Sequence, residues 1–297
     1  MNHKIICFGE TLWDMLPSGH LPGGAPMNVA IHLKYNGYEP LIISRVGSDD
    51  LGGALLEFLK KKHLATQYIQ LSKTHLTGVV KVNMDDKNEI TYKIVEPVAW
   101  DYIQYEEQTA QLIGHSDVFV YGSLAARSLT SQATLLQYLP MAKQKVFDVN
   151  LRPPYYNPGL IQHLLTFADI VKMNHQELAL IMGWFGLAGD EQQQMRYIRE
   201  RFGLHLLIVT RGANGAAVLS PEGYWDHPGY PVTVEDTIGS GDAFLATFLS
   251  NYLGQKSLAD CLQYACLAGA YVATCKGATP TYDPLELEEA SLSLAAQ

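Results

Sequence analysis

A segment with unusual chemistry lies late in the chain, at residues 236–244, where the sequence reads DTIGSGDAF before an apolar stretch. Two glycines and a serine ahead of a helix leave consecutive backbone N–H groups open to a ligand. The positive end of the helix dipole adds to their attraction for an anion. The segment therefore predicts a phosphate cradle. It is not a P-loop, because no Lys-Ser/Thr pair follows the glycines, and no G-x-G-x-x-G dinucleotide fingerprint follows the first apolar strand.

Asp242 lies inside this segment, where a carboxylate repels the anion that its neighbours attract. Two interpretations stay open from the spacing. Asp242 caps the helix, or it faces a neutral hydroxyl and takes its proton as a phosphoryl group arrives. A base in phosphoryl transfer needs correct position and ionisation, so an Asp with an ordinary pKa suffices.

A second glycine-rich segment, LPGGAPMNVA, lies at residues 21–30. Gly23 and Gly24 let the backbone approach a ligand closely, and Pro26 suits the first turn of a helix. Asn28 then lies one turn into that helix. Its amide is placed to hydrogen-bond a polyol, or the segment is a plain turn-to-helix junction.

Other polar residues follow predicted strands, where open α/β sheets bind their ligands. Asp14 follows the first strand, and residues 148–152 (DVNLR) end another. Asn174 and Glu177 are three residues apart, a spacing that suits either a hydrated Mg²⁺ or a capping box. Residues 210–215 (TRGANG) form a strand end with a glycine turn, or only a hairpin.

In this order, the segments closely resemble those of the ribokinase-like (PfkB) carbohydrate kinases. That family carries an early Gly-Gly with Asn four residues after the second Gly, here Gly23, Gly24 and Asn28. It also carries a late Asp-Thr-x-Gly-Ala/Ser-Gly-Asp, here residues 236–242. The resemblance runs from Ile5 to about Pro280, and the early motifs look most like those of fructokinases.

The resemblance implies a role for each matched residue. The implied catalytic set is Asp242, as the base that deprotonates a primary hydroxyl of the sugar, with Gly239, Ser240 and Gly241 as the anion hole. The implied substrate-binding residues are Asp14, Gly23, Gly24, Asn28 and Arg152.

The resemblance further implies an ATP site, with Mg²⁺ and a K⁺ ion as cofactors. The nucleotide would be bound by Asn174, Thr210, Gly212, Gly215 and Gly241, with the helix around Ala265–Ala270 near the adenine. Asn174 and Glu177 would act on Mg²⁺ through water. The implied K⁺ site comprises Asp236, Ile238, Val272, Cys275, Gly277 and Thr281.

Alternating strands and helices must position these residues. Short apolar runs predict strands at 5–9, 41–46, 118–121, 145–149, 170–172 and 206–210. Helical patterns lie at 27–35, 51–61, 132–139, 177–182, 192–201, 241–253, 258–276 and 283–292. The alternation predicts an α/β fold with a mostly parallel sheet covered on both faces, consistent with a single ribokinase-like domain over residues 1–297.

One region departs from this pattern. Apolar and polar residues alternate at 80–84 and 90–94 around a polar turn, which predicts a β-hairpin with one apolar face. We expect a small β-sheet lid built from about residues 11–21 and 67–100. Its apolar face would cover a substrate cleft or the same hairpin of a second subunit, which suggests a homodimer through the lid.

The composition narrows the class of partner. The 297 residues are 47% hydrophobic and carry a net charge of −9, so the chain lacks the basic stripe that binds nucleic acid. No apolar run approaches the roughly 18 residues of a membrane span. The four cysteines lack the spacing of a disulfide framework, and the first residues, MNHKIICFGE, lack a signal-peptide layout. We therefore expect a cytoplasmic protein with small-molecule ligands and no nucleic-acid or membrane partner.

The expected activity is ATP-dependent phosphorylation of a primary hydroxyl on a ketohexose, with fructose first. Ribose, 2-keto-3-deoxygluconate and nucleosides are the alternative acceptors within the same fold. A regulator that binds sugar or nucleotide without chemistry is a second alternative. A dinucleotide oxidoreductase is disfavoured by the missing fingerprint.

Overall fold

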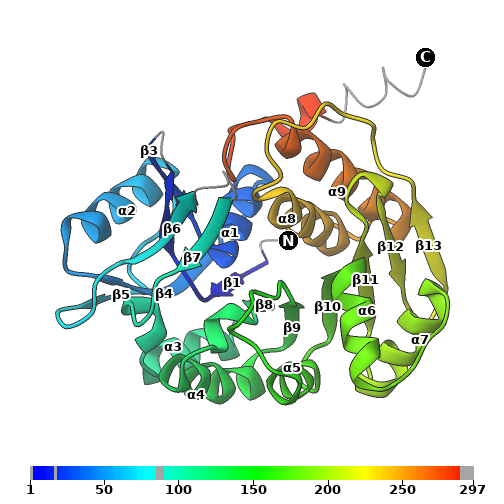
Figure 1. The fold of residues 1–297 in the computed structure, drawn as a ribbon, viewed down its shortest axis with the longest axis horizontal. Helices are drawn as coiled ribbons and strands as arrows, with labels where there is room; N and C mark the ends of the chain where they lie inside the picture. The colour runs from blue at the N-terminus through cyan, green and yellow to red at the C-terminus, as the bar shows by residue number, and fades with distance from the viewer. Residues whose placement is uncertain (1–2, 17–18, 85–89, 288–297) are drawn as a thin grey trace.

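A nine-stranded sheet forms the centre of the computed structural model, which describes residues 3–16, 19–84 and 90–287 (Figure 1). Across the sheet the strands are β13 (Tyr224–His227), β12 (Ala216–Leu219), β11 (Leu206–Thr210), β10 (Ile170–Asn174), β9 (Gln144–Asp148), β8 (Val118–Gly122), β1 (Ile5–Phe8), β4 (Leu41–Gly47) and β5 (Ile69–Ser72). The strands from β11 to β5 are parallel, and β12 and β13 are antiparallel additions at one edge. The predicted α/β fold with a mostly parallel sheet is confirmed.

Helices cover both faces of the sheet, as the continuous apolar strands predict. One face carries α3 (Glu107–Gly114), α4 (Leu129–Tyr138), α5 (Pro158–Leu165), α6 (His175–Trp184) and α7 (Glu191–Phe202). The other carries α1 (Ala25–Tyr35), α2 (Asp50–Lys61), α8 (Ser240–Leu253) and α9 (Leu258–Ala273). Alternate residues of β1 show the division, because Ile6 and Phe8 enter the first core and Ile5 and Cys7 enter the second.

Helix starts follow local capping chemistry. The Asp49 side chain accepts a hydrogen bond from Gly52 N at the start of α2, and Asp190 and Gln193 form a capping box at α7.

The sequence patterns missed α3, α5, β5 and β13, whose apolar repeats are short. The predicted helix at 283–292 extends beyond the described residues. No helix within the described ranges is long and apolar enough to cross a membrane.

A separate four-stranded sheet forms the lid, in the order β3 (Gly19–Gly23), β2 (Leu12–Leu16), β6 (Gly78–Met84) and β7 (Ile90–Ile94). The predicted hairpin is confirmed, although its turn lies outside the described residues. The expected lid ranges of 11–21 and 67–100 need a correction. Residues 69–72 are β5, which pairs with β4 in the central sheet and buries Ile69 in its core, while β3 continues to Gly23.

Apolar side chains in the described part of the lid pack against their own chain. Leu12, Val80 and Ile94 pack in one cluster with Trp100 and other apolar side chains. The lid therefore has an intramolecular use for its apolar face, and the homodimer through the lid stays a prediction.

A buried ion pair fixes the end of β7 to the main domain. Arg127 Nε and Nη2 donate to Asp101 Oδ1 and Oδ2 at 2.7 and 2.8 Å, and the side chains are 2% and 3% exposed. Arg127 Nη2 also donates to Val95 O at 2.7 Å, and Tyr155 Oη donates to Ile94 O at 2.6 Å. The guanidinium carbon lies 3.9 Å from the ring centre of Trp100. These contacts anchor one end of the lid.

Replacing Arg127 by Met should lower the free energy of unfolding by about 3 kcal/mol, because it leaves the Asp101 carboxylate buried without its partner. Urea denaturation followed by tryptophan fluorescence measures the change. The matched control is Lys60→Met, which breaks the exposed pair with Glu57 and should cost less than about 0.5 kcal/mol. Equal losses in the two variants would contradict the anchoring role.

Candidate active site

Polar residues collect at the carboxyl ends of the parallel strands. Glu10 follows β1, Asn150 and Arg152 follow β9, and Asn174 ends β10, whereas Asp14 lies in lid strand β2, the next element after β1. Parallel strands bring these ends to one edge of the sheet, next to the lid. This is the position at which open α/β sheets bind ligands.

Two cavities meet at the loop that precedes α8. The first, which we call the lid cavity, has a volume of about 670 Å³ and lies between the lid and the strand ends. The second, the α9 cavity, has a volume of about 390 Å³ and lies against α8 and α9. Thr237 and Gly241 line both cavities, whereas Asp242 lines only the lid cavity and Ser240 only the α9 cavity. The glycine-rich loop is therefore the boundary between two ligand spaces.

The backbone of this loop depends on Gly239. Gly239 is the N-cap of α8 and has a φ of 79°, in the left-handed region that favours glycine. A Cβ atom there would collide with the backbone of Ala278. The Asp236 carboxylate also stabilises the loop, since it accepts hydrogen bonds from Ile238 N at 3.0 Å and Gly277 N at 3.3 Å. The positive end of α8 is thereby placed at the boundary of the two cavities.

His32 of α1 supports the segment behind this loop. Its Nε2 lies 2.9 Å from Ala278 O and its Nδ1 lies 3.0 Å from Tyr282 Oη. Burial lowers the pKa of His32 to about 4, so the ring is neutral near pH 7. Nε2–H then donates to the Ala278 carbonyl and Nδ1 accepts from the tyrosine hydroxyl.

Asp242 does not cap α8. The N-cap is Gly239, and Asp242 Oδ2 accepts a hydrogen bond from Asn28 Nδ2 at 2.8 Å. Burial raises the pKa of Asp242 to about 7, and the carboxylate of Asp148 adds to the shift, while Lys172 and Asn28 oppose it. The structure thus places a carboxylate that titrates near neutral pH on the wall of the lid cavity.

Lys172 forms a buried ion pair that the sequence analysis did not assign to the site. Its Nζ donates to Asp148 Oδ1 at 2.9 Å, and a Cβ added to Gly241 would lie 3.2 Å from the same Nζ. Burial alone would lower the pKa of Lys172, but the carboxylates of Asp148 and Asp242 outweigh it and the pKa is raised. A lysine within the otherwise apolar strand β10 was the available signal, because lysine is rarely buried without a partner.

Asn174 and Glu177 form the capping box of α6. Asn174 Oδ1 accepts from Glu177 N and Glu177 Oε2 accepts from Asn174 N, both at 2.8 Å, while Glu177 Oε1 accepts from Leu151 N at 2.7 Å. These bonds leave lone pairs that can reach a cation through water. Asp148 Oδ2 is buried and has no hydrogen-bond partner in the described part of the chain, which fits a water-bound cation nearby. No cluster of three His, Cys, Asp or Glu in that part holds a metal directly.

The implied substrate residues come together in the lid cavity. Asp14, Gly24, Asn28 and Arg152 line it, together with Glu10, which the sequence analysis did not assign. Gly23 does not line the cavity, but it packs so closely against Asp14 that a side chain there would collide with the carboxylate. Burial raises the pKa of Asp14 to about 6, although the positive charge of Arg152 lowers it.

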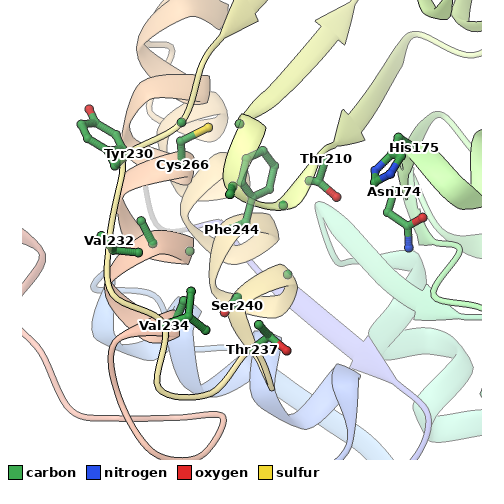
Figure 2. A pocket seen from close by; sticks show the side chains of 18 of the residues that line it. Asn174, His175, Thr210, Tyr230, Val232, Val234, Thr237, Ser240, Phe244 and Cys266 are labelled. Carbon is green, nitrogen blue, oxygen red and sulfur yellow. The ribbon is translucent and has the colours of Figure 1, made fainter.

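The implied nucleotide residues line the α9 cavity: Asn174, Thr210, Gly212, Gly215 and Gly241. Figure 2 shows Phe244, Cys266, Tyr230, Val232 and Val234 on one side and Asn174 and His175 on the other. Within the predicted Ala265–Ala270 stretch, Cys266, Gly269 and Ala270 line the cavity, and Ala265 is buried in the core. Residues 210–215 connect the antiparallel strands β11 and β12. The turn of this hairpin therefore forms part of the wall of the α9 cavity.

The residues of the implied K⁺ site are only partly brought together. Asp236 and Gly277 are hydrogen-bonded, and Cys275 N donates to Val272 O at 3.0 Å. Ile238 N donates to Asp236. The Thr281 hydroxyl instead accepts from Lys62 Nζ at 3.0 Å, so a positive charge already lies beside it.

Comparisons with known proteins identify the family of the chain. The pfkB family of carbohydrate kinases matches residues 8–284. The fructokinase of Klebsiella pneumoniae is 30% identical over 94% of this chain and 95% of the relative, and that of Salmonella typhimurium is 29% identical with the same coverage.

Solved structures show the same fold. The fructokinase from Xylella fastidiosa with bound ATP superposes with a TM-score of 0.85 at 23% identity, over 98% of this chain and 100% of that chain. Aminoimidazole riboside kinase from Salmonella enterica, complexed with aminoimidazole riboside and an ATP analogue, has a TM-score of 0.79 at 26% identity, over 97% and 99%. The chain belongs to the pfkB family of carbohydrate kinases and is an ATP-dependent carbohydrate kinase.

Proposed function

We propose that this kinase transfers the γ-phosphoryl group of ATP to a primary hydroxyl of fructose in the cytoplasm. The observation that carries the proposal is the shared boundary of the two cavities, with Asp242 on one side of the Thr237–Gly241 loop and Ser240 on the other. ATP would occupy the α9 cavity and the sugar the lid cavity. All four cysteines are free thiols, in keeping with a reducing compartment.

The proposed reaction is a direct in-line displacement. Asp242 takes the proton of the sugar hydroxyl, the oxygen forms a bond to the γ-phosphorus, and the bond from phosphorus to the β,γ-bridging oxygen breaks to release ADP. The backbone N–H groups of Gly239, Ser240 and Gly241, at the positive end of α8, stabilise the charge on the transferred group. The lid excludes water, which would otherwise accept the phosphoryl group.

The cofactors of this proposal are Mg²⁺ and K⁺. Mg²⁺ bound with ATP would be held through water by Asn174, Glu177 and Asp148, and would neutralise charge on the phosphate oxygens. We place K⁺ beside the loop, where Asp236 and Gly277 are already adjacent. Both ions bind near the start of α8 in this assignment.

The charges of the lid cavity favour a neutral acceptor. Its lining includes the carboxylates of Glu10, Asp14, Asp236 and Asp242. Arg152 is the main counter-charge, because Lys172 is already paired with Asp148. A sugar acid such as 2-keto-3-deoxygluconate would meet this negative field, whereas a polyol finds hydrogen-bond acceptors.

A nucleoside is the second candidate acceptor. The structure of aminoimidazole riboside kinase is similar to this chain at 26% identity, and a riboside also offers neutral hydroxyls to the same carboxylates. Fructose comes first, because the two curated relatives described above are named fructokinases.

A panel of acceptors tests the proposal. With Mg-ATP, we expect ADP release with fructose at least tenfold above that with ribose, 2-keto-3-deoxygluconate, glucose and aminoimidazole riboside, measured by coupled assay with and without K⁺. If the riboside is the preferred acceptor, the proposed substrate is a nucleoside instead of fructose, and the proposed phosphoryl transfer is unchanged. Preferred turnover of the sugar acid would contradict the charge argument.

Replacing Asp242 by Asn should lower kcat by about 100- to 10,000-fold, the usual contribution of a positioned base, with ATP affinity retained. Calorimetry measures ATP binding separately from turnover. The matched control is Asp50→Asn, another aspartate in the first turn of a helix, which is exposed and lines neither cavity. A kcat for Asp242→Asn within threefold of the parent would refute the base assignment.

The pH profile provides an independent test. The base must be ionised, and burial raises the pKa of Asp242 to about 7, so kcat should be full above that pH and fall tenfold per pH unit below it. Asn28 donates a hydrogen bond that favours the ionised carboxylate of Asp242. Asn28→Ala should therefore raise the pKa of Asp242 and move the fall of kcat to higher pH. If kcat of the parent enzyme falls only near pH 4, Asp242 is not the base with a raised pKa.

A further inference from the structure

Glu10 is a buried carboxylate on the wall of the lid cavity with no role in the reaction described above. It follows β1 by two residues, is 3% exposed, and lines the cavity beside Asp14 and Asn28. The same edge of the cavity holds the side chain of Arg152. A carboxylate in such a place needs a physical reason, because burial of a charged group without partners is costly.

The two carboxylate oxygens of Glu10 have different environments. Oε1 accepts a hydrogen bond from Ala25 N at 3.2 Å. Ala25 is the first residue of α1, whose N-cap, Gly24, has no side chain that could serve this N–H group. Oε1 therefore caps the helix that carries Asn28. Capping requires only one oxygen, and this role would be satisfied equally well by an amide.

Oε2 is the oxygen without an assigned partner. It is buried and makes no hydrogen bond within the described part of the chain. Burial raises the pKa of Glu10, while the N–H groups of Glu10 and Ala25 and the charges of Arg152 and Arg127 oppose the shift. Arg127 is already bound to Asp101. A hydrogen-bond donor brought into the cavity by a ligand would satisfy Oε2 and stabilise the ionised form.

We propose that Glu10 Oε2 accepts a hydrogen bond from a hydroxyl of the sugar, so that Glu10 is a specificity-determining residue in addition to Asp14 and Asn28. The proposal rests on the proposed function, because it takes the lid cavity as the acceptor site. A carboxylate accepts from a hydroxyl and repels a carboxylate or phosphate. Glu10 therefore selects a neutral, unphosphorylated polyol at this position.

Glu10→Gln is the sharpest test, because it keeps the shape of the side chain. The amide oxygen can still accept from Ala25 N, while the NH₂ group replaces Oε2 and turns an acceptor into a donor. We expect KM for fructose to rise about 10- to 100-fold, as for a lost hydrogen bond to a charged group. KM for ATP should stay within twofold and the melting temperature within 2 °C. Glu57→Gln, at an exposed glutamate on α2, is the matched control and should change neither KM.

Epimers of fructose identify the hydroxyl. The C3, C4 and C5 epimers of D-fructose (D-psicose, D-tagatose and L-sorbose) each reorient one hydroxyl. In the wild-type enzyme, the epimer at the bound position should have a lower kcat/KM than fructose. In Glu10→Gln this difference should shrink at least tenfold, because the charged acceptor of that hydroxyl is gone. The other epimers should keep their penalties.

The outcomes separate this inference from the proposed function. If the wild-type enzyme uses no ketohexose, the proposed function fails and the inference fails with it. If wild type uses fructose and Glu10→Gln has the same KM for fructose and the same epimer penalties within twofold, Glu10 is a helix cap only and the inference alone is overturned. A Glu10→Gln variant that loses stability as well as affinity for both substrates would also overturn it.

Discussion

The hydrogen bond from Asn28 to Asp242 is the interaction on which the site depends. It joins two residues that are 214 positions apart, one on α1 and one on α8. The two helices pack against each other on one face of the sheet. α1 also carries His32, one turn later, which supports Ala278 behind Gly239. One helix thus orients the carboxylate and the wall of the glycine loop together.

Charge balance around this bond defines the chemistry. Asp242 and Asp148 are two buried carboxylates that share one ammonium, Lys172. The arrangement keeps Lys172 positive and leaves Asp242 with a pKa raised to about 7, where it exchanges a proton at neutral pH. A further positive group as close to Asp242 as Lys172 would lower the pKa of Asp242 and make it a weaker base, and the loss of Lys172 would keep it protonated. In the proposed function, the negative lid cavity would bind a neutral acceptor and the positive end of α8 would bind the anionic donor.

Much of the fold could be predicted because the parallel strands are short, continuous apolar runs. Strands at 5–9, 41–46 and 206–210 were found within two residues of their observed limits. Polar residues at their ends then indicated the edge that holds both cavities. β5 lies inside the expected lid range of 67–100, and only its backbone pairing with β4 shows that it belongs to the central sheet.

The residues that the sequence did not reveal are those whose partners are distant. The sequence analysis assigned no role to Lys172, Arg127 or Glu10, because only the fold brings them to their partners Asp148, Asp101 and Ala25. The residues with two open interpretations are equally instructive. Asn174 and Glu177 form a capping box, and Asn174 also lines the α9 cavity. Residues 210–215 connect two antiparallel strands, and Thr210, Gly212 and Gly215 line the same cavity. The structural role of these residues is thus compatible with the proposed one.

The proposed arrangement of the two substrates can be tested by a crystal structure with fructose and a non-hydrolysable ATP analogue. We expect the triphosphate in the α9 cavity, with its γ-phosphate at the N-terminus of α8. We also expect a primary hydroxyl of fructose in the lid cavity, within about 3 Å of the Asp242 carboxylate and in line with the γ-phosphorus. Fructose bound with both primary hydroxyls turned away from Asp242, or a triphosphate bound in the lid cavity, would contradict this arrangement.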